Sequence, residues 1–290
     1  MENFDYYNPT KIVFGENRLS ELNNLIPQQA KVLVLYGGGS VEKYGTLEKV
    51  LAGLGDREVH TFAGIEPNPE FETLMKAVAL VQEKEIDFLL AVGGGSVMDG
   101  TKFVALAAKE HENHQSILFH GFEPVPSTTA IPLGCVATLP ATGSEMNSFG
   151  VITFNHQKFP FTTPLAFPQF SFLDPELTLT LPKEQIANGV ADAFIHVIEQ
   201  YLTTPANARI QDRFAEGILK TLIAPGTFVT KDTPLIIIES MKMENEIRAP
   251  HDAFIKTVSI QSNDVVEADQ LLIVFAKKGP YNGIKSPADE

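Results

Sequence analysis

The stretch IDFLLAVGGGSVMDGTK, residues 86–102, contains a strand, a glycine loop and the start of a helix in direct succession. Residues 86–92 are almost continuously apolar, which is typical of a strand that is covered on both faces of a sheet. The sequence GGGS at 93–96 ends this strand, and from residue 97 to 109 the apolar residues recur at helical spacing. We therefore expect a strand that turns tightly into a helix.

A similar order occurs elsewhere in the chain. KVLVLY, residues 31–36, runs straight into the triple glycine at 37–39, and residues 69–84 show helical spacing. AIPLGCVATLP, residues 130–140, is a further apolar strand that ends in the turn-rich ATGSEMN. Strands that alternate with helices in this way predict the α/β class, with a Rossmann-like parallel sheet and flanking helices.

Composition limits the classes of partner. The chain has 290 residues, of which 44% are hydrophobic, so it can bury a core of one large or two ordinary domains. Its net charge of −14 repels nucleic acids and anionic membranes, and we expect neither as a partner. Cys135, the single cysteine, excludes an intramolecular disulfide. The sequence shows neither a signal peptide nor an apolar run of roughly 20 residues, so we expect a cytoplasmic location.

The glycine loop at 93–96 suits a phosphate. Consecutive glycines let the backbone approach an anion, and the N–H groups that open the next helix point toward it. Gly94, Gly95 and Ser96 fit this use, and Asp99 stands one turn further on, where it can accept a ribose hydroxyl or cap local backbone. A glycine run alone also marks a plain turn, but two such loops and ATGSE at a third strand end favour nucleotide binding.

Four motifs together resemble the iron-containing alcohol dehydrogenases, and most of all their NADPH-dependent aldehyde reductase (butanol dehydrogenase) branch. They are IEPNP at 65–69, GGGSVMDGTK at 93–102, TLPATGSEMN at 138–147 and NGVADAFIHVIEQY at 188–201. The resemblance covers about residues 1–223 and implies an oxidoreductase that acts on small alcohols and aldehydes. It further implies cofactor contacts at Gly94, Gly95, Ser96, Asp99, Thr138, Thr142 and Ser144.

The first glycine loop bears on the choice of cofactor. An acidic side chain at the end of a nucleotide-binding strand accepts the 2′-hydroxyl of NAD and repels the 2′-phosphate of NADP. This chain places Gly37, Gly38 and Ser40 there, which leaves space and donors for a phosphate. By family analogy Lys158 is a candidate counter-charge, although a solvated loop lysine is the alternative. NADP(H) is therefore the expected cofactor.

The motif NGVADAFIH implies metal ligands. Asp192 and His196 lie four residues apart on a helix expected at about 183–202, so that both side chains leave the same face. In the family this position binds Fe²⁺ or Zn²⁺, although such a pair alone is ordinary on a helix. The family pattern demands two further histidines from a helical domain, whereas His251 is the only histidine after residue 223. We therefore expect an incomplete metal site and an impaired oxidoreductase.

The character of the sequence changes near residue 224. A second helix is expected at about 206–223, and β-branched runs with short polar turns follow it. Residues 226–237 also resemble residues 263–274 in their pattern, which indicates two small half-motifs. We therefore predict two domains, 1–223 and 224–290, the second a small all-β unit.

ESMKMENEI, residues 239–247, resembles the lysine hairpin of biotinyl (hammerhead) domains. It predicts a tight turn between strands at 234–239 and 244–249, with Lys242 at the tip. The resemblance implies that a biotin ligase attaches biotin to Lys242 and that carboxylase subunits are partners; an exposed hairpin lysine is the bland alternative. The strands that should precede residue 226 are replaced by the second helix, so this domain is expected to be incomplete.

The two resemblances give two hypotheses of different class. The first is an NADP(H)-linked alcohol/aldehyde oxidoreductase with a residual metal site. The second is a biotin carrier whose working residue is Lys242. A fusion joined out of context accounts for both, and the oligomeric state stays open, a homodimer included.

Overall fold

The computed structural model describes residues 7–110, 114–203, 208–222, 228–229, 234–240, 243–248, 253–258 and 273–275. The chain forms two compact units that divide between Pro182 and Lys183. The sequence instead predicts a boundary near residue 224, which stays a prediction. Among the described residues, no helix has the length and apolar character needed to cross a membrane.

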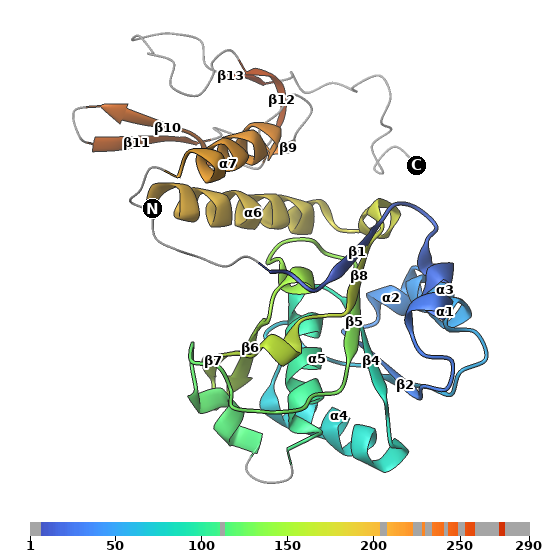
Figure 1. Cartoon of the computed structure of the whole chain (residues 1–290). Helices are drawn as coiled ribbons and strands as arrows, with labels where there is room; N and C mark the ends of the chain where they lie inside the picture. Colours follow the sequence, from blue (N-terminus) through green and yellow to red (C-terminus); the bar gives the residue numbers. More distant parts are fainter. Residues whose placement is uncertain are drawn as a thin grey trace. The chain divides into compact units, whose positions relative to one another are not determined.

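The first unit is built on a six-stranded, fully parallel sheet with the order β1-β8-β5-β4-β2-β3 (Figure 1). This confirms the predicted α/β class. The strands are β1 (Lys11–Phe14), β2 (Val32–Tyr36), β3 (Val59–Phe62), β4 (Phe88–Gly93), β5 (Leu133–Ala137) and β8 (Phe170–Leu173).

Both faces of this sheet are buried, which explains the continuous apolar runs. In β2, Leu33 and Leu35 belong to one core with α4 and α5, whereas Val32 and Val34 belong to a second core with η1, α1 and α3. Alternate residues of a strand point to opposite faces, so a strand between two helical layers must be apolar throughout. The flanking elements are η1 (Leu19–Glu21), α1 (Leu22–Leu25), α2 (Ser40–Lys43), α3 (Thr46–Leu54), α4 (Phe71–Lys84) and α5 (Gly95–Ala107).

The connections leave the sheet in opposite directions at β2 and β4. From β2 the chain continues to β3 on one side, and from β4 it continues to β5 on the other side. The two strands are neighbours, with Tyr36 opposite Val92. The crevice outside the carboxyl ends of two such strands is where open α/β sheets bind ligands. Both triple-glycine loops follow these two strands.

An antiparallel hairpin, β6 (Phe149–Phe154) and β7 (Gln157–Thr162), packs on α5 and was not predicted. Asn155 and His156 connect its strands with positive φ of 49° and 61°. This is the geometry that a two-residue hairpin loop requires. Short 3₁₀ turns complete the unit: η2 (His114–Phe119), η3 (Ser144–Met146), η4 (Pro164–Ala166) and η5 (Pro175–Thr178).

The second unit begins with two helices that contact each other, α6 (Lys183–Thr203) and α7 (Arg209–Leu222). Both lie where the sequence predicts them. The predicted hairpin is also present, as β10 (Pro234–Ser240) paired antiparallel with β11 (Met243–Arg248). Three further strands pair with one another, β9 (Phe228–Val229), β12 (Ala253–Val258) and β13 (Ile273–Phe275). Most of the second sequence repeat lies outside the described residues.

Candidate functional site

The loop after β4 presents free backbone donors at the start of α5. Gly94 caps the helix in an extended conformation, and the helix begins at Gly95. Within the part of the chain that the structure covers, the amide N–H groups of Gly95 and Ser96 have no acceptor. Both residues are half-buried, so solvent reaches this turn. Free amides at a helix N-terminus attract an anion, as predicted for these residues.

The loop after β5 lies directly against this turn. Thr138 donates its amide to Gly93 O at 3.0 Å, which joins the ends of the two strands. A Cβ added to Gly95 would lie 2.6 Å from Thr142 Oγ1, and one added to Gly94 would lie 3.2 Å from Leu139 Cβ. A larger residue at either position would displace the loop, so the two glycines let the exposed Thr142 lie at the edge of the α5 N-terminus.

The IEPNP segment joins the two glycine loops. A Cβ added to Gly37 would lie 3.1 Å from the carbonyl oxygen of Ile65, so a side chain at this position would crowd the crossing. Two residues beyond the crossing stands Pro67, and then Asn68 donates its amide to Ser96 Oγ at 3.2 Å. The segment thus connects the loop after β2 to the first turn of α5.

The loop after β2 is open to solvent at Gly38 and Ser40. Gly39 has φ of +90°, a backbone conformation that favours glycine. No acidic side chain stands at the end of β2 itself, but the carboxylate of Glu42 follows in the first turn of α2. It accepts a hydrogen bond of 2.7 Å from the Tyr36 hydroxyl. The sequence interpretation overlooked this negative charge beside the loop.

Asp99 and Ser144, which were both predicted to contact the cofactor, form a hydrogen bond with each other. Ser144 Oγ donates to Asp99 Oδ1 at 2.6 Å, and Val151 donates its amide to Asp99 Oδ2 at 3.0 Å. Burial raises the pKa of Asp99, while Lys102 and these two hydrogen bonds oppose the rise. The sequence left two roles open for Asp99, a contact with a ribose hydroxyl and capping of local backbone. The hydrogen bond from the Val151 amide matches the second role.

Lys102 is the residue that the sequence interpretation missed. It is fully buried in α5, and its ammonium donates to Ser144 Oγ at 2.8 Å, Asn147 Oδ1 at 2.9 Å and Phe149 O at 2.7 Å. Burial lowers its pKa to about 8, and the charge of Asp99 limits the fall. The sequence does contain a sign of this role, because Lys102 lies three residues after Asp99, on the same face of an otherwise apolar helix.

Lys158 lies on β7 opposite Thr153 and is exposed. Within the described ranges it makes no hydrogen bond or ion pair with either glycine loop. Its predicted role as a counter-charge therefore stays a prediction, next to the alternative of a solvated lysine.

The predicted metal pair lies on α6. His196 Nε2 is 3.6 Å from Asp192 Oδ1, and both side chains are largely exposed, at 49% and 42% respectively. No group of three or more His, Cys, Asp or Glu side chains that could hold a metal ion occurs in the described part of the chain. A catalytic zinc site usually has three protein ligands and an open position, so the residues present do not fit such an ion.

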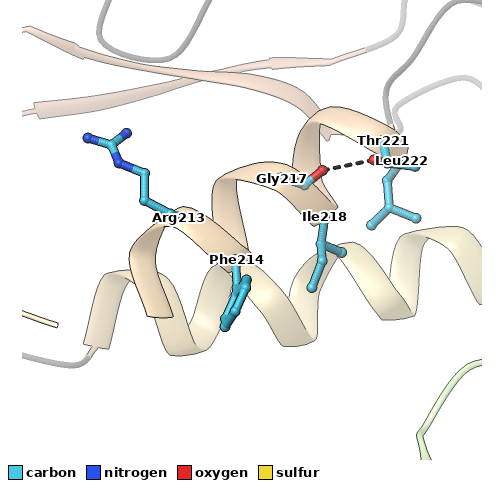
Figure 2. A pocket seen from close by; sticks show the side chains of 6 residues that line it. All are labelled: Arg213, Phe214, Gly217, Ile218, Thr221 and Leu222. Carbon is cyan, nitrogen blue, oxygen red and sulfur yellow. Dashed lines mark hydrogen bonds between the residues drawn. The ribbon is translucent and has the colours of Figure 1, made fainter. Parts of the chain in front are cut away.

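A shallow pocket of about 370 Å³ lies over α7 and is lined by Arg213, Phe214, Gly217, Ile218, Thr221 and Leu222 (Figure 2). All six of these residues come from this one helix, so among the described residues no second element lines the pocket. It contains none of the predicted site residues. Lys242, the predicted biotin acceptor, stands between β10 and β11 in the sequence and lies outside the described residues.

Comparisons with known proteins agree with both parts of the chain. The family model for iron-containing alcohol dehydrogenase matches residues 9–175, and the model for biotin-requiring enzymes matches residues 208–275. The NADPH-dependent aldehyde reductase YqhD of Escherichia coli strain K12 is 53% identical over 236 residues, 80% of this chain and 60% of that protein. The probable NADH-dependent butanol dehydrogenase 1 of Bacillus subtilis strain 168 is 45% identical over 228 residues, 77% of this chain and 58% of that protein.

Solved structures agree with the dehydrogenase match. The crystal structure of E. coli K-12 YqhD matches with a TM-score of 0.74 at 53% identity, over 76% of this chain and 57% of that chain. The NADH-dependent butanol dehydrogenase A of Thermotoga maritima matches with a TM-score of 0.72 at 35% identity, over 77% and 56%. The chain thus spans less than two thirds of the length of these relatives.

The family model nevertheless covers more than half of this chain, at residues 9–175. Residues 208–275 in addition match the biotin-requiring enzymes. Because the parallel sheet of the first unit agrees with the solved structures over the same region, the chain belongs to the iron-containing alcohol dehydrogenase family.

Proposed function

We propose that the first unit binds NADP(H) across the carboxyl ends of β2 and β4, as part of an alcohol/aldehyde oxidoreductase. The free amides of Gly95 and Ser96 would hold the pyrophosphate, and the open loop at Gly38 and Ser40 would hold the 2′-phosphate. When bound, NADPH supplies the hydride that reduces a small aldehyde to its alcohol. The relative YqhD, by its name, uses NADPH.

One observation carries this proposal. Two glycine loops end adjacent strands at the point where the sheet connections diverge, and the second loop has free N–H donors at the start of a 13-residue helix. Thr138 and Thr142 border the same turn from the loop after β5. Anion-binding amides at a topological switch point are the common feature of dinucleotide sites.

The proposed reduction is impaired in this chain. Hydride transfer in the family is assisted by a metal ion, whereas the described residues provide only Asp192 and His196 for it. Both are largely exposed, and a two-ligand site holds Fe²⁺ or Zn²⁺ weakly. We therefore assign binding of the nucleotide to the first unit and expect little turnover of an aldehyde.

Calorimetric titration of the full chain with NADPH tests the proposal, with NADH as the matched control. We expect saturable binding of NADPH and weaker binding of NADH, because only NADPH carries the 2′-phosphate. Equal affinity for the two would remove the preference for NADPH. No saturable binding of either would remove the proposed nucleotide site.

A second candidate function is a biotin carrier, which the match of residues 208–275 to biotin-requiring enzymes favours. The antiparallel pairing of β10 with β11, with Ser240 opposite Met243, agrees with a tight hairpin around Lys242. An amide bond between biotin and Lys242 removes the lysine charge and forms a long tether, which suits transfer of carboxyl groups.

Mass spectrometry after co-expression with a biotin ligase tests this second function. We expect one biotinyl group on the wild type and none on Lys242→Arg, which keeps the charge but is not a ligase substrate. An unmodified wild-type chain, or a group attached equally to the variant, would contradict the assignment.

A further inference from the structure

Lys102 connects three acceptors from one short segment of chain. Ser144 and Asn147 belong to the loop after β5, and Phe149 begins β6. Asp99, on the preceding turn of α5, holds Ser144 and the amide of Val151. Two charged residues of α5 thus fix residues 144–151, the segment that follows Thr142.

This network holds the loop near the proposed phosphate site. Asp99 and Lys102 lie one and two turns after the free amide of Gly95, and Thr142 packs on Gly95 itself. The ammonium is fully buried behind the loop, so it does not reach the nucleotide. It acts on the site only through the residues that it holds.

We propose that Lys102 is a positioning residue for the nucleotide: its three hydrogen bonds set the loop of residues 142–147 against the N-terminus of α5. This assignment rests on the proposed function of the first unit. An ammonium has three donors for three acceptors, whereas a neutral amine has two. Loss of the proton therefore leaves one acceptor of the loop without its bond.

The network consequently makes nucleotide affinity dependent on pH. The groups that act on the Lys102 charge are Asp99 on α5, Glu145 on η3 and Cys135 on β5. Burial raises the pKa of Cys135 to about 12, so this thiol stays neutral through the range in which Lys102 titrates near its pKa of about 8. Lys102 is therefore the group of this network that loses its proton between pH 7 and 9.5.

Two variants of the full chain separate this role from a general loss of charge. Lys102→Gln keeps a polar side chain but has no ammonium, and Lys109→Met removes a positive charge from the exposed residue that follows α5. NADPH affinity is measured by calorimetry from pH 7 to 9.5. At pH 7 we expect about ten-fold weaker binding to Lys102→Gln, as for the loss of a hydrogen bond to a charged group. The wild type and Lys109→Met should weaken as the pH rises, and Lys102→Gln should not.

Hydrogen exchange provides a readout without nucleotide. The amides of Phe149 and Val151 donate to Asn147 Oδ1 and Asp99 Oδ2, whereas Thr153, on the same strand, donates to Pro69 O outside the network. At one fixed pH, Lys102→Gln should speed exchange at Phe149 and Val151 and leave Thr153 protected. Faster exchange at all three would indicate general unfolding of the hairpin and would overturn the assignment.

The outcomes distinguish the two proposals. If the wild type binds NADPH and Lys102→Gln binds it equally at every pH, the positioning role is wrong while the nucleotide site stands. If the wild type binds no NADPH, the proposed function fails, and the hydrogen-exchange data decide whether Lys102 holds the loop. Unchanged protection of Phe149 and Val151 in Lys102→Gln would overturn that role. Selective loss of protection at these two amides would support it.

Discussion

Thr142 stands so close to Gly95 that a methyl group added to the glycine would lie 2.6 Å from the threonine Oγ1. The side chain of Thr142 therefore packs directly on the backbone of the first turn of α5. Gly95→Ala should displace the exposed Thr142 and cover the free amides. We expect about ten-fold weaker NADPH binding, comparable to the loss of one strong hydrogen bond, with little change in melting temperature. Unchanged affinity in calorimetry would contradict the proposed phosphate position.

Glu42 places a carboxylate beside the loop at Gly38 and Ser40. If the 2′-phosphate of NADPH binds in this loop, Glu42→Gln should strengthen NADPH binding about three-fold at low salt, because a nearby like charge is removed. NADH lacks this phosphate and serves as the control, for which we expect little change. An equal gain for both cofactors would place the 2′-phosphate elsewhere.

The buried Lys102 predicts a rise of stability with pH. Its pKa is about 8 in the folded chain, whereas the ordinary value for lysine, which applies to the unfolded chain, is 10.5. Between these values the unfolded chain binds more protons, so the free energy of unfolding increases as the pH rises. The full contribution is on the order of 3 kcal/mol. Denaturant unfolding of the wild type and Lys102→Gln from pH 7.5 to 10 should show this slope in the wild type alone; parallel slopes would refute it.

Gly134 lies in β5 under the ring of Phe170, which in turn stacks on Phe88 with 5.8 Å between ring centroids. Gly134→Ala would force the ring of Phe170 to move, and overpacking of this kind costs about 1–3 kcal/mol. Gly38→Ala is the matched control for stability, because no atom lies within 4 Å of its added Cβ. Thermal unfolding should separate the two variants, and equal melting temperatures would contradict the packing argument.

The exposed pair Asp192 and His196 should matter little to stability. His196→Ala removes one partner, and exposed pairs contribute about 0–1 kcal/mol. We expect an unchanged melting temperature and, in the wild type, less than one equivalent of iron or zinc by elemental analysis. A full equivalent that disappears in His196→Ala would show that the metal site is complete after all.

The sequence predicted three of the six strands of the central sheet, because β2, β4 and β5 are apolar throughout and β2 and β4 run into glycine loops. The pattern identified β2, β4 and β5 together with α4 and α5, and the structure places all of them in one parallel sheet with helices against it. Strands β1, β3 and β8 were not predicted. Each has only four residues, too few for a pattern to distinguish them from a loop.

The sequence pointed to the glycines of the candidate site but not to the hydrogen bonds around them. Gly95 and Ser96 were identified because a strand, a loop and a helix follow one another in the sequence. The bonds of Lys102 to Asn147 and Phe149 join residues 45 and 47 positions apart, and no local pattern reports them. For the same reason Asp99 was considered for the ribose, while its bond to Val151 became evident only from the fold.

Strand β1 pairs with β8, so its only neighbour in the sheet is made much later than β1 itself. Synthesis at about 5 to 20 residues per second puts roughly 8 to 30 seconds between the two strands. During this interval β1 has no partner in the sheet, and β5, once it is made, forms the open border of the growing layer. Arrival of Phe170–Leu173 covers that border and captures β1 in the same event. A ribosome that pauses before Phe170 would therefore leave β1 unpaired and one edge of β5 open, and open strand edges favour aggregation.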